Sequence, residues 1–263
     1  MTSIVIVSHN SAADLPACLR SVRAHSDDAE IIVIDTASRD GSADAASTWA
    51  DRVVRLAHNG GYAPAAMLGA RLAAGPALLF LNPDTVVGPG WLEHLRAHLR
   101  PGVAAVGPVS NWVWGFQKVQ VWAPPAWDLA GMSAEQVATG LYTARAGMGV
   151  PVLSLTGFCL LVEGAAFGAL GFDEEFTHGA DDLDFSLRAR EAGYQLTLAT
   201  DTFIFHHGGR SFGSEPPAEI AAHQAAMLHR LAAKTLARRG RLEDPRALFG
   251  FRPFDWPDSY SRP

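Results

Sequence analysis

The sequence predicts an α/β protein with a mostly parallel central sheet flanked by helices, followed by a C-terminal helix and tail. Two features predict this class. Short apolar runs alternate with helix-like segments through the first hundred residues, and the apolar residues within each run are continuous. Continuous apolar strands are typical of a parallel sheet covered on both faces, and regular strand–helix alternation favours a doubly wound arrangement. Ligands of such sheets bind beyond the carboxyl ends of the strands.

The first half of the chain supplies most of the regular elements. Strands are expected at residues 4–8, 31–35, 53–56, 77–81 and 103–106. The segment 11–14 (SAAD) resembles a capping box, so a helix should follow it, with apolar residues at helical spacing. Further helices are expected at residues 42–49, 65–74 and 91–99.

The second half is less regular. From residue 108 to 151 the alternation stops, and four of the seven tryptophans occur there: Trp112, Trp114, Trp122 and Trp127. Long irregular insertions are often lids or binding loops, so these rings either stack on a sugar ring or fill the core. Regular elements are expected again as a helix opened by Ser133 to Gln136, a helix from the acidic run 181–184 to Gly193, strands at 195–200 and 203–205, and a last helix at 218–240.

Composition limits the class of protein. The 263 residues, 48% of them apolar, suffice for one large domain or two small ones. The net charge of −6 argues against nucleic acid as a partner, because phosphate binding needs a basic surface. Cys18 and Cys159 are expected in a helix and a strand, without metal-site spacing, and so as reduced thiols of the core.

The sequence favours a cytoplasmic location. The apolar run at residues 4–7 is too short for a signal peptide, and no run of about 18 apolar residues is present. Peripheral contact with the inner face of a membrane is left open, because the last helical stretch is basic. Its charged residues are His229, Arg230, Lys234, Arg238, Arg239 and Arg241.

Polar residues follow three of the expected strands where each strand ends. They are Ser8-His9-Asn10, Asp35 and Asn82-Pro83-Asp84. Asp, Asn and Ser favour turns, which explains any one of these groups. Three together at the edge where ligands bind predict a polar crevice. No G-x-G-x-x-G follows the first strand and no P-loop motif is present, so diphosphate binding would need a metal or another device.

Two further clusters carry chemistry. Three acids in four residues, Asp181, Asp182 and Asp184, crowd like charges at a helix start, where the helix dipole favours ionised carboxylates. Asp182 is therefore a candidate general base, and contact of this cluster with a metal is the alternative. His206-His207 ends an apolar strand beside glycines, which favours contact with a metal or phosphate over a structural role.

A rival motif lies just after these histidines. Residues 209–213 (GRSFG) match G-x-S-x-G, the nucleophile elbow of serine hydrolases. The elbow requires a helix directly after the serine, followed by an acid and a histidine. Ser214-Glu215-Pro216-Pro217 comes next instead, so a hydrolase based on Ser211 is disfavoured.

Seven segments in register over residues 3–213 resemble the inverting family-2 glycosyltransferases with a GT-A fold, particularly the rhamnosyltransferase-like branch. The opening strand and helix (IVIVSHNSAADLPACLRSV), VIDTASRDGS, HNGGYAPAAMLGA and FLNPDTVVGPGWLEHL resemble the nucleotide-sugar half of that family. The segments LTGFCLLVEGAAFGALGFDEEF, ADDLDFSLRAREAGY and HHGGRSF resemble its acceptor half. Each segment is modest alone, whereas seven in the same order are specific.

The resemblance implies roles for individual residues. Asp182 would be the catalytic base, and Asp84 with His206 would hold Mg²⁺ or Mn²⁺ against the donor diphosphate. Asp181, Trp112 and Trp114 would lie on the acceptor side. The nucleotide-sugar donor, a dTDP- or UDP-sugar, would be bound by Ser8, His9, Asn10, Asp35, Asn59, Gly61, Asn82 and Asp84.

The chain departs from the family pattern at three positions. Thr36 stands where the family often has a second Asp, Asn82 replaces the first acid of the D-x-D motif, and Asp181 replaces the Glu before the base. Fewer carboxylates imply weak metal binding until the diphosphate adds oxygens. A fold-related protein that binds a nucleotide sugar or carbohydrate without catalysis is therefore the alternative function.

The resemblance also implies the domain organisation and partners. Residues 1–213 would form the GT-A domain, divided into a nucleotide-sugar half (1–107) and an acceptor half (108–213), and residues 214–263 the C-terminal helix and extended tail. The acceptor would be a carbohydrate, a lipid-linked sugar or a small molecule. The tail would pack against the domain or against a second subunit of a homodimer.

Overall fold

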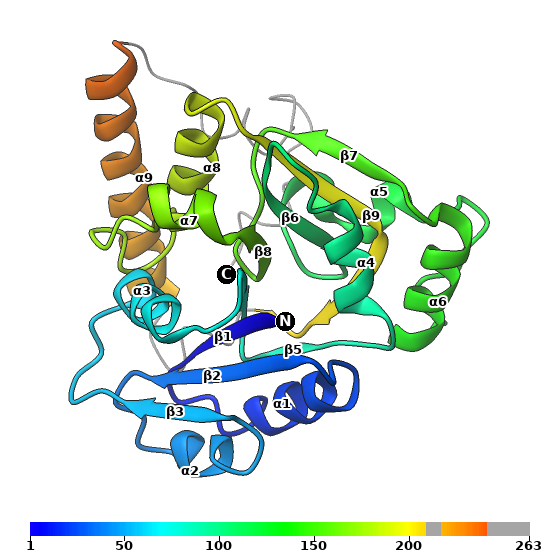
Figure 1. Ribbon diagram of the computed structural model, residues 1–263, viewed down its shortest axis with the longest axis horizontal. Helices are drawn as coiled ribbons and strands as arrows, with labels where there is room; N and C mark the ends of the chain where they lie inside the picture. The colour runs from blue at the N-terminus through cyan, green and yellow to red at the C-terminus, as the bar shows by residue number, and fades with distance from the viewer. Residues whose placement is uncertain (209–216, 241–263) are drawn as a thin grey trace.

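The computed structural model describes residues 1–208 and 217–240, and within them nine strands form a single sheet (Figure 1). Their order across the sheet is β3-β2-β1-β4-β8-β6-β9-β5, with β7 paired to β9. The strands are β1 (Thr2–Ser8), β2 (Ala29–Asp35), β3 (Arg52–Arg55), β4 (Ala77–Leu81), β5 (Thr85–Val86), β6 (Val103–Ser110), β7 (Gly149–Val152), β8 (Cys159–Glu163) and β9 (Gln195–His206).

The helices of the described chain match most of the predicted segments. They are α1 (Leu15–Ala24), α2 (Ser42–Ala46), α3 (Tyr62–Leu72), α4 (Trp91–His98), the 3₁₀ turn η1 (Gly115–Gln117), α5 (Val119–Trp122), α6 (Ala134–Arg145), α7 (Gly164–Leu170), α8 (Asp181–Glu191) and α9 (Pro217–Arg239). None of the described helices is both long enough and apolar enough to cross a bilayer.

The parallel part of the sheet is confirmed. Strands β3, β2, β1 and β4 pair in parallel, and Ser8 at the end of β1 lies in register with Asp35 at the end of β2. The carboxyl ends of these strands therefore meet at one edge of the sheet. The residues after β1, β2 and β4, which the sequence singled out as polar, are brought together by this register.

The second half makes the sheet mixed. Strand β8 runs antiparallel between β4 and β6, while β6 and β9 pair in parallel. Strand β9 is one long strand where two runs were expected, and its pairing with β6 shifts register between Ala199 and Phe203. Strand β6 spans the boundary expected between the two halves at residues 107 and 108, so both halves share it.

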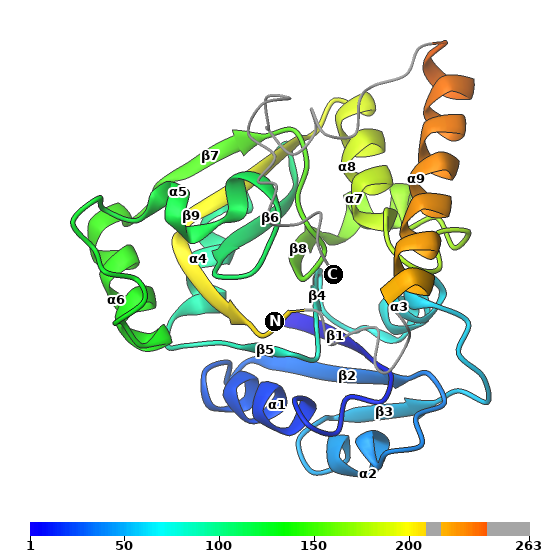
Figure 2. The ribbon, with the colours of Figure 1, turned by 180° about the vertical axis from the view of Figure 1, so that it is seen from behind.

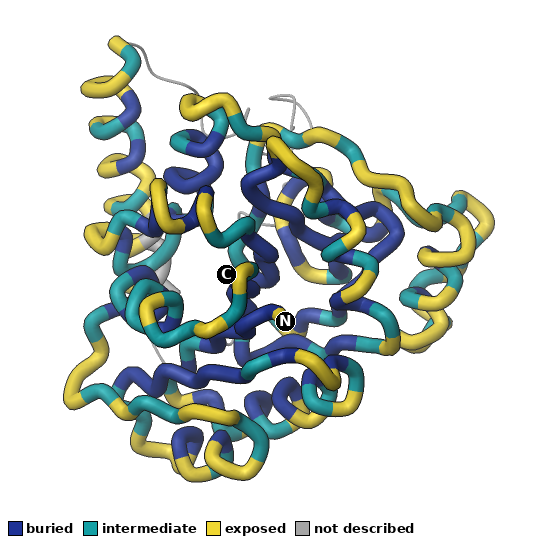
Figure 3. The backbone as a smooth tube through the Cα atoms, in the orientation of Figure 1, coloured by how far each residue is buried: buried dark blue, intermediate teal, exposed yellow. Residues whose placement is uncertain are grey.

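Two apolar layers hold the sheet between helices. Along β1, Ile4 and Ile6 face one layer, which contains α1, α2 and α4, whereas Val5 faces the other, which contains α3, α7 and α8. This alternation follows from the two-residue period of a strand. Figure 3 shows the buried residues concentrated along the central strands and in the inner faces of the helices. The two buried thiols, Cys18 and Cys159, lie in this core and form no disulfide, as expected.

One of the two expected capping boxes forms. Ser133 accepts a hydrogen bond from the Gln136 backbone N–H, and the Gln136 side chain accepts one from the Ser133 N–H, so α6 opens as predicted. The capping box expected at Ser11 is wrong. The Ser11 hydroxyl donates to the carbonyl of His9, its N–H donates to Oγ of Ser42, and α1 begins four residues later without a side-chain cap.

Helix α9 packs beside α8 in both views of the ribbon (Figure 1, Figure 2). Its basic residues pair with carboxylates of α8 and of the loop that precedes α8. Lys234 contacts Asp173 and Glu175. Arg238 contacts Glu191 and also Asp184, which is fully buried. These cations are therefore already engaged within the chain, which weakens the basis for membrane contact through α9.

Candidate functional site

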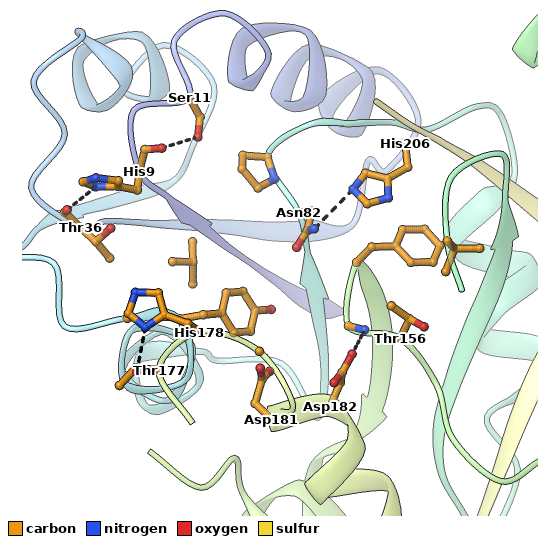
Figure 4. A pocket seen from close by; sticks show the side chains of 18 of the residues that line it. His9, Ser11, Thr36, Asn82, Thr156, Thr177, His178, Asp181, Asp182 and His206 are labelled. Carbon is orange, nitrogen blue, oxygen red and sulfur yellow. Dashed lines mark hydrogen bonds between the residues drawn. The ribbon is translucent and has the colours of Figure 1, made fainter. Parts of the chain in front are cut away.

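A pocket of about 270 Å³ opens at the edge of the sheet where β1, β2 and β4 end (Figure 4). Its walls come from both halves of the chain. The first half contributes the loops after these strands and the start of α3, and the second contributes the segments 112–114, 156–158 and 177–182 together with the end of β9.

Most of the predicted site residues line this pocket. Those that do are His9, Asn59, Gly61, Asn82, Trp112, Trp114, Asp181, Asp182 and His206. Four others do not line it: Ser8, Asn10, Asp35 and Asp84. Asp35 and Asp84 are both only 2% exposed, so the two carboxylates expected to face the donor are buried.

The loops after β1 and β2 are fixed to each other. Nδ1 of His9 lies 2.7 Å from the carbonyl oxygen of Thr36, so Nδ1 carries the proton and donates. Asn10 adopts a left-handed conformation with φ of 47°, which Asn tolerates better than most residues, and its side-chain oxygen accepts from the N–H of Arg39. The side chains of this end of the pocket are thus held before any ligand binds.

Two buried polar atoms at this end have no partner. Within the described residues, Oδ1 of Asp35 and the hydroxyl of Ser8 make no hydrogen bond, although Oδ2 of Asp35 accepts one from the N–H of Ser38. A buried polar atom without a partner costs free energy of about 1–3 kcal/mol. Ser8 and Asp35 are paired residues of β1 and β2 at the pocket edge. A ligand that donates a hydrogen bond there would supply the missing partner.

A second cluster joins the end of β4 to the end of β9. Nε2 of His206 lies 3.2 Å from Oδ1 of Asp84 and 3.4 Å from the side-chain amide of Asn82. Nδ1 of His206 lies 2.8 Å from the carbonyl oxygen of Trp112 and donates to it. In a neutral ring Nε2 then carries the lone pair, which faces away from Trp112. The His206 ring stacks on Phe158.

This cluster fits a divalent cation that has few protein ligands. Oδ1 of Asp84 is buried and accepts no hydrogen bond, while Oδ2 accepts one from the N–H of Gly208. Adjacent ligands of an octahedral ion with bonds of about 2.1 Å are about 3 Å apart, close to the spacing of Oδ1 and Nε2. Within residues 1–208 and 217–240 no three His, Cys, Asp or Glu side chains form a ready metal cage, so other ligands would have to come with the substrate.

The acidic end of the pocket is the first turn of α8. Ala180 precedes it with φ of 66°, a conformation rare for alanine, and so turns the chain sharply into the helix. Oδ2 of Asp182 accepts a hydrogen bond of 2.7 Å from the N–H of Gly157, and Oδ1 accepts one of 2.8 Å from the N–H of Leu183. In Figure 4, Asp181 and Asp182 lie side by side on the pocket wall, across from His9 and Asn82.

The two carboxyl groups do not ionise alike. Burial, and then the charge of Asp182, raises the pKa of Asp181 well above its ordinary value. Burial also raises the pKa of Asp182, but the hydrogen bonds from the N–H groups of Gly157 and Leu183 oppose that rise. The favoured singly charged state therefore has Asp182 ionised and Asp181 protonated. The third acid, Asp184, points away and pairs with Arg188 and Arg238.

Several residues that line the pocket were not singled out from the sequence. Tyr62 has the largest polar side chain among them. Tyr62 opens α3, and its N–H donates a 2.9 Å hydrogen bond to the carbonyl oxygen of Thr177. Burial, followed by the charges of Asp181 and Asp182, raises its pKa well above the ordinary value, so its phenol stays neutral. Thr156, Thr177 and His178 also line the pocket, and nothing in their sequence context distinguished them.

Gly61 permits this junction between the halves. A Cβ at Gly61 would lie 2.5 Å from Cβ of Thr177, and its φ of 94° is one that side-chain-bearing residues rarely adopt. The glycine therefore lets the start of α3 approach the loop before α8. Without that approach Tyr62 would not enter the pocket beside the acids.

The tryptophans of the irregular segment divide between the two roles considered. Trp112 and Trp114 line the pocket and are 43% and 37% exposed. Trp122 and Trp127 pack instead against an apolar cluster around α6. Ser211, on which the hydrolase alternative depends, lies outside the described residues, as do the residues of the tail after 240.

Comparison with known proteins shows what the first half of the chain resembles. Residues 3–126 match the model of the family described as glycosyl transferase family 2. This part of the chain is similar to glycosyl transferase family 2. The matched residues contain most of β1, all of β2 to β6, and the loops that carry His9, Asp35 and Asp84, so one wall of the pocket lies within them.

Two curated relatives are also similar to the chain. The chain is 30% identical over 158 residues to an N-acetylglucosaminyl-diphospho-decaprenol L-rhamnosyltransferase of Mycobacterium tuberculosis, a match that covers 56% of this chain and 52% of the relative. It is 27% identical to a validoxylamine A glucosyltransferase of Streptomyces hygroscopicus subsp. jinggangensis, over 86% of this chain and 57% of the relative. The chain thus spans little more than half the length of these relatives.

A solved structure shows that the chain has the GT-A fold. A mannosyltransferase of Pyrobaculum calidifontis, solved in complex with GDP-Man and Mn²⁺, superposes with a TM-score of 0.65. The match covers 95% of this chain and 68% of that one, at 19% sequence identity. The predicted α/β class and GT-A fold are confirmed.

Proposed function

We propose that the protein is an inverting glycosyltransferase that moves a sugar from a nucleoside-diphosphate donor, a dTDP- or UDP-sugar, to an acceptor hydroxyl. The observation that carries the proposal is that Asp182 lines the same pocket as Asn82 and His206. A carboxylate suited to remove a proton therefore shares one cavity with the residues next to the candidate cation site. The family match supports a glycosyl transfer reaction.

The general base in this proposal is Asp182. Its carboxylate takes the proton from the acceptor hydroxyl while that oxygen attacks the anomeric carbon. The bond between the anomeric carbon and the diphosphate oxygen breaks on the opposite side, and its electron pair leaves with the nucleoside diphosphate. This single displacement inverts the anomeric carbon and requires no covalent enzyme intermediate. The hydrogen bonds from Gly157 and Leu183 hold the carboxylate in place.

The donor is bound at the opposite end of the pocket. The unpartnered Oδ1 of Asp35 and the hydroxyl of Ser8 would bind the nucleoside, beside the loop that His9 and Asn10 hold rigid. Asn59, Gly61 and Asn82 would line the path of the diphosphate and sugar. Every one of these assignments places the donor between the sheet edge and α8.

Asp84 and His206 would hold Mg²⁺ or Mn²⁺, with the amide oxygen of Asn82 as a further donor after rotation of its side chain. The cation would supply positive charge beside the departing diphosphate. Oδ1 of Asp84 accepts no hydrogen bond and lies 3.2 Å from Nε2 of His206, and this spacing supports the assignment. Because only two or three protein ligands are present, we expect affinity for the free ion to be low.

The acceptor is proposed to enter past Trp112 and Trp114, whose half-exposed rings can stack on a sugar. Asp181, protonated beside the base, can donate a hydrogen bond to an acceptor hydroxyl. The Mycobacterium relative is named for a lipid-linked diphosphate sugar and the Streptomyces relative for a small molecule, so both classes are candidates beside a free carbohydrate.

A panel of nucleotide sugars tests the proposal. The melting temperature is measured with each donor in the presence and absence of Mn²⁺, because a ligand that binds only the native state raises it. The donor that gives the largest rise is then incubated with Mn²⁺ and candidate acceptors, and release of the nucleoside diphosphate is followed. A rise for one class of nucleotide together with its release supports the proposal, and no rise with any donor contradicts it.

A second function, binding of a nucleotide sugar without catalysis, is favoured by the lack of a three-ligand metal cage within the described residues. The same assay separates the two functions. A binding protein would show the melting-temperature rise but would release no nucleoside diphosphate with any acceptor or with water.

A further inference from the structure

The end of β9, which carries His206, is held from both sides. On one side β5 pairs with it, and Thr85 lies in register with His206. On the other side the pairing of β6 with β9 ends at Ser110, which lies in register with Ile204. The backbone ladder with β6 therefore ends before it reaches His206, the residue whose side chain lies beside Asp84.

The side chain of Asn111 continues this pairing in place of the backbone. Its Oδ1 accepts a 2.9 Å hydrogen bond from the N–H of His206, and its Nδ2 donates one of 2.9 Å to the carbonyl oxygen of the same residue. One amide thus satisfies both polar backbone groups of His206, as a neighbouring strand would. Only one orientation of the amide meets both groups, so this side chain fixes where the His206 backbone lies.

The next residue, Trp112, fixes the ring of His206. Its carbonyl oxygen accepts from Nδ1 at 2.8 Å, and its indole packs edge-on against the imidazole, with 5.3 Å between the ring centroids. The indole also lies against Gly208, where a Cβ would come 2.0 Å from the ring. Gly208 donates its N–H to Oδ2 of Asp84. The pair Asn111-Trp112 therefore acts on both candidate cation ligands.

This arrangement determines which nitrogen of His206 faces Asp84. With Nδ1 bonded to the carbonyl of Trp112, a neutral ring presents the lone pair of Nε2, which lies 3.2 Å from Oδ1 of Asp84. If the backbone of His206 moved, Nδ1 would lose that carbonyl, and either nitrogen could then carry the proton. A protonated nitrogen has no lone pair for a cation, so the position of the backbone matters for binding.

We propose that Asn111 is a positioning residue, whose amide holds the end of β9 so that Nε2 of His206 is turned toward the candidate cation site. Asn111 acts through His206 and not by contact with the cation or the substrate. Only the assignment of a cation to this site rests on the proposed function. The effect of Asn111 on the His206 ring does not depend on it.

The His206 ring is observed without metal, donor or turnover. In the full chain with ¹⁵N-labelled histidine, magnetic resonance distinguishes the two neutral tautomers at about pH 8, where an ordinary imidazole is neutral. The spectrum of His206→Gln identifies the signals. The unchanged chain is compared with Asn111→Leu, which nearly keeps the shape of the side chain but loses its polar atoms.

A matched control is the variant Gln117→Met. The Gln117 amide also bonds two backbone groups, since it donates to the carbonyl of Pro108 and accepts from the N–H of Thr156. Its loss therefore removes the same kind of interaction without a contact to His206. The melting temperatures of both variants show that each is folded.

We expect the unchanged chain and Gln117→Met to carry the proton on Nδ1 of His206, and the signals of Asn111→Leu to be displaced toward the tautomer protonated on Nε2. Asn111→Ala leaves room for water to bond the two freed backbone groups, so it provides the same measurement if Asn111→Leu does not fold. Unchanged His206 signals in a folded Asn111 variant would overturn the inference. So would an equal displacement in Gln117→Met, or a proton on Nε2 in the unchanged chain.

Binding of Mn²⁺ in the presence of UDP or dTDP, followed by electron paramagnetic resonance, measures the consequence. Loss of a group that orients a metal-binding histidine typically weakens metal binding about 10–100-fold, and we expect this loss for Asn111→Leu but not for Gln117→Met. Normal Mn²⁺ affinity in Asn111→Leu would overturn the inference. If no chain binds Mn²⁺ while the tautomers behave as expected, the proposed cation site is contradicted and the positioning of His206 by Asn111 is supported.

Discussion

The N–H of Gly157 donates a 2.7 Å hydrogen bond to Oδ2 of Asp182 and thereby links the loop before β8 to the first turn of α8. Gly157 is closely packed there, since a Cβ on it would lie 3.3 Å from Cβ of Asp182. The carboxylate is thus held by two backbone N–H groups while it still lines the pocket. A base positioned in this way needs no reorganisation before it accepts a proton.

Replacement Asp182→Asn should lower kcat by about 10²–10⁴-fold, because the amide cannot accept the proton of the acceptor hydroxyl. The donor-induced rise in melting temperature should persist, since donor contacts lie at the other end of the pocket. Steady-state kinetics and a thermal-shift titration measure the two effects. A variant that retains near-normal turnover would show that another group is the base.

The pH dependence of the rate follows from the raised pKa of Asp182. A base must be ionised to act, so kcat should fall as the pH drops through that pKa, and the acid limb should lie above the value of about 3.9 typical of a free Asp side chain. A pH–rate profile between about pH 4 and 8 measures the limb. An acid limb at or below the ordinary value would contradict the burial of this group.

Asp181 should make stability depend on pH in a defined direction. Its folded-state pKa is raised, so its contribution favours the folded state fully below the unfolded value and is lost as the pH rises through the folded value. Asp181→Asn removes this loss. The free energy of unfolding of the variant, relative to the unchanged protein, should therefore increase from about pH 4 upward. Denaturant titrations at several pH values measure the difference, and a difference that stays constant with pH would contradict the prediction.

Asp84 should govern the requirement for a divalent ion. Asp84→Asn keeps an oxygen for the N–H of Gly208 but removes the charge next to His206. The Mn²⁺ concentration for half-maximal activity should rise about tenfold or more, since a charged ligand is replaced by a neutral one. Binding of Mn²⁺ in the presence of nucleoside diphosphate, followed by electron paramagnetic resonance, should weaken in parallel.

The exposed Asp44, which pairs with Arg55 on the surface, provides the control for that experiment. Asp44→Asn should leave the Mn²⁺ requirement unchanged. Equal Mn²⁺ binding by the Asp84 variant and the unchanged protein would remove Asp84 from the candidate cation site.

The parallel half of the fold could be predicted from the sequence because its signals are local. Continuous apolar runs identified β1, β2, β4 and β6, and the polar residues after three strands marked the pocket edge. The antiparallel direction of β8 could not be predicted, because an apolar strand such as Cys159–Glu163 reads the same in either direction. Strand direction depends on the path of the chain between elements.

The candidate site was predictable in its residues but not in their exposure. Asp84 was recognised at a strand end, yet its carboxylate is buried against His206 at the end of β9 and Gly208 just after it, more than a hundred residues away. Tyr62 was missed for a similar reason. Its entry into the pocket depends on the contact of Gly61 with Thr177, which no local pattern encodes.

Gly61 supplies a matched pair of tests with its neighbour Gly60. Gly61→Ala should lower the free energy of unfolding by about 2–4 kcal/mol, because the new methyl group would overlap Thr177 and the residue would keep an unfavourable positive φ. At Gly60 no atom lies within 4 Å of an added Cβ, so Gly60→Ala should change stability by less than about 0.5 kcal/mol. Equal stability of both variants in denaturant would show that the junction between α3 and Thr177 is loose. In the expected case, the Gly61 variant should also lose the donor-induced rise in melting temperature, since the two halves of the chain would no longer close around the same pocket.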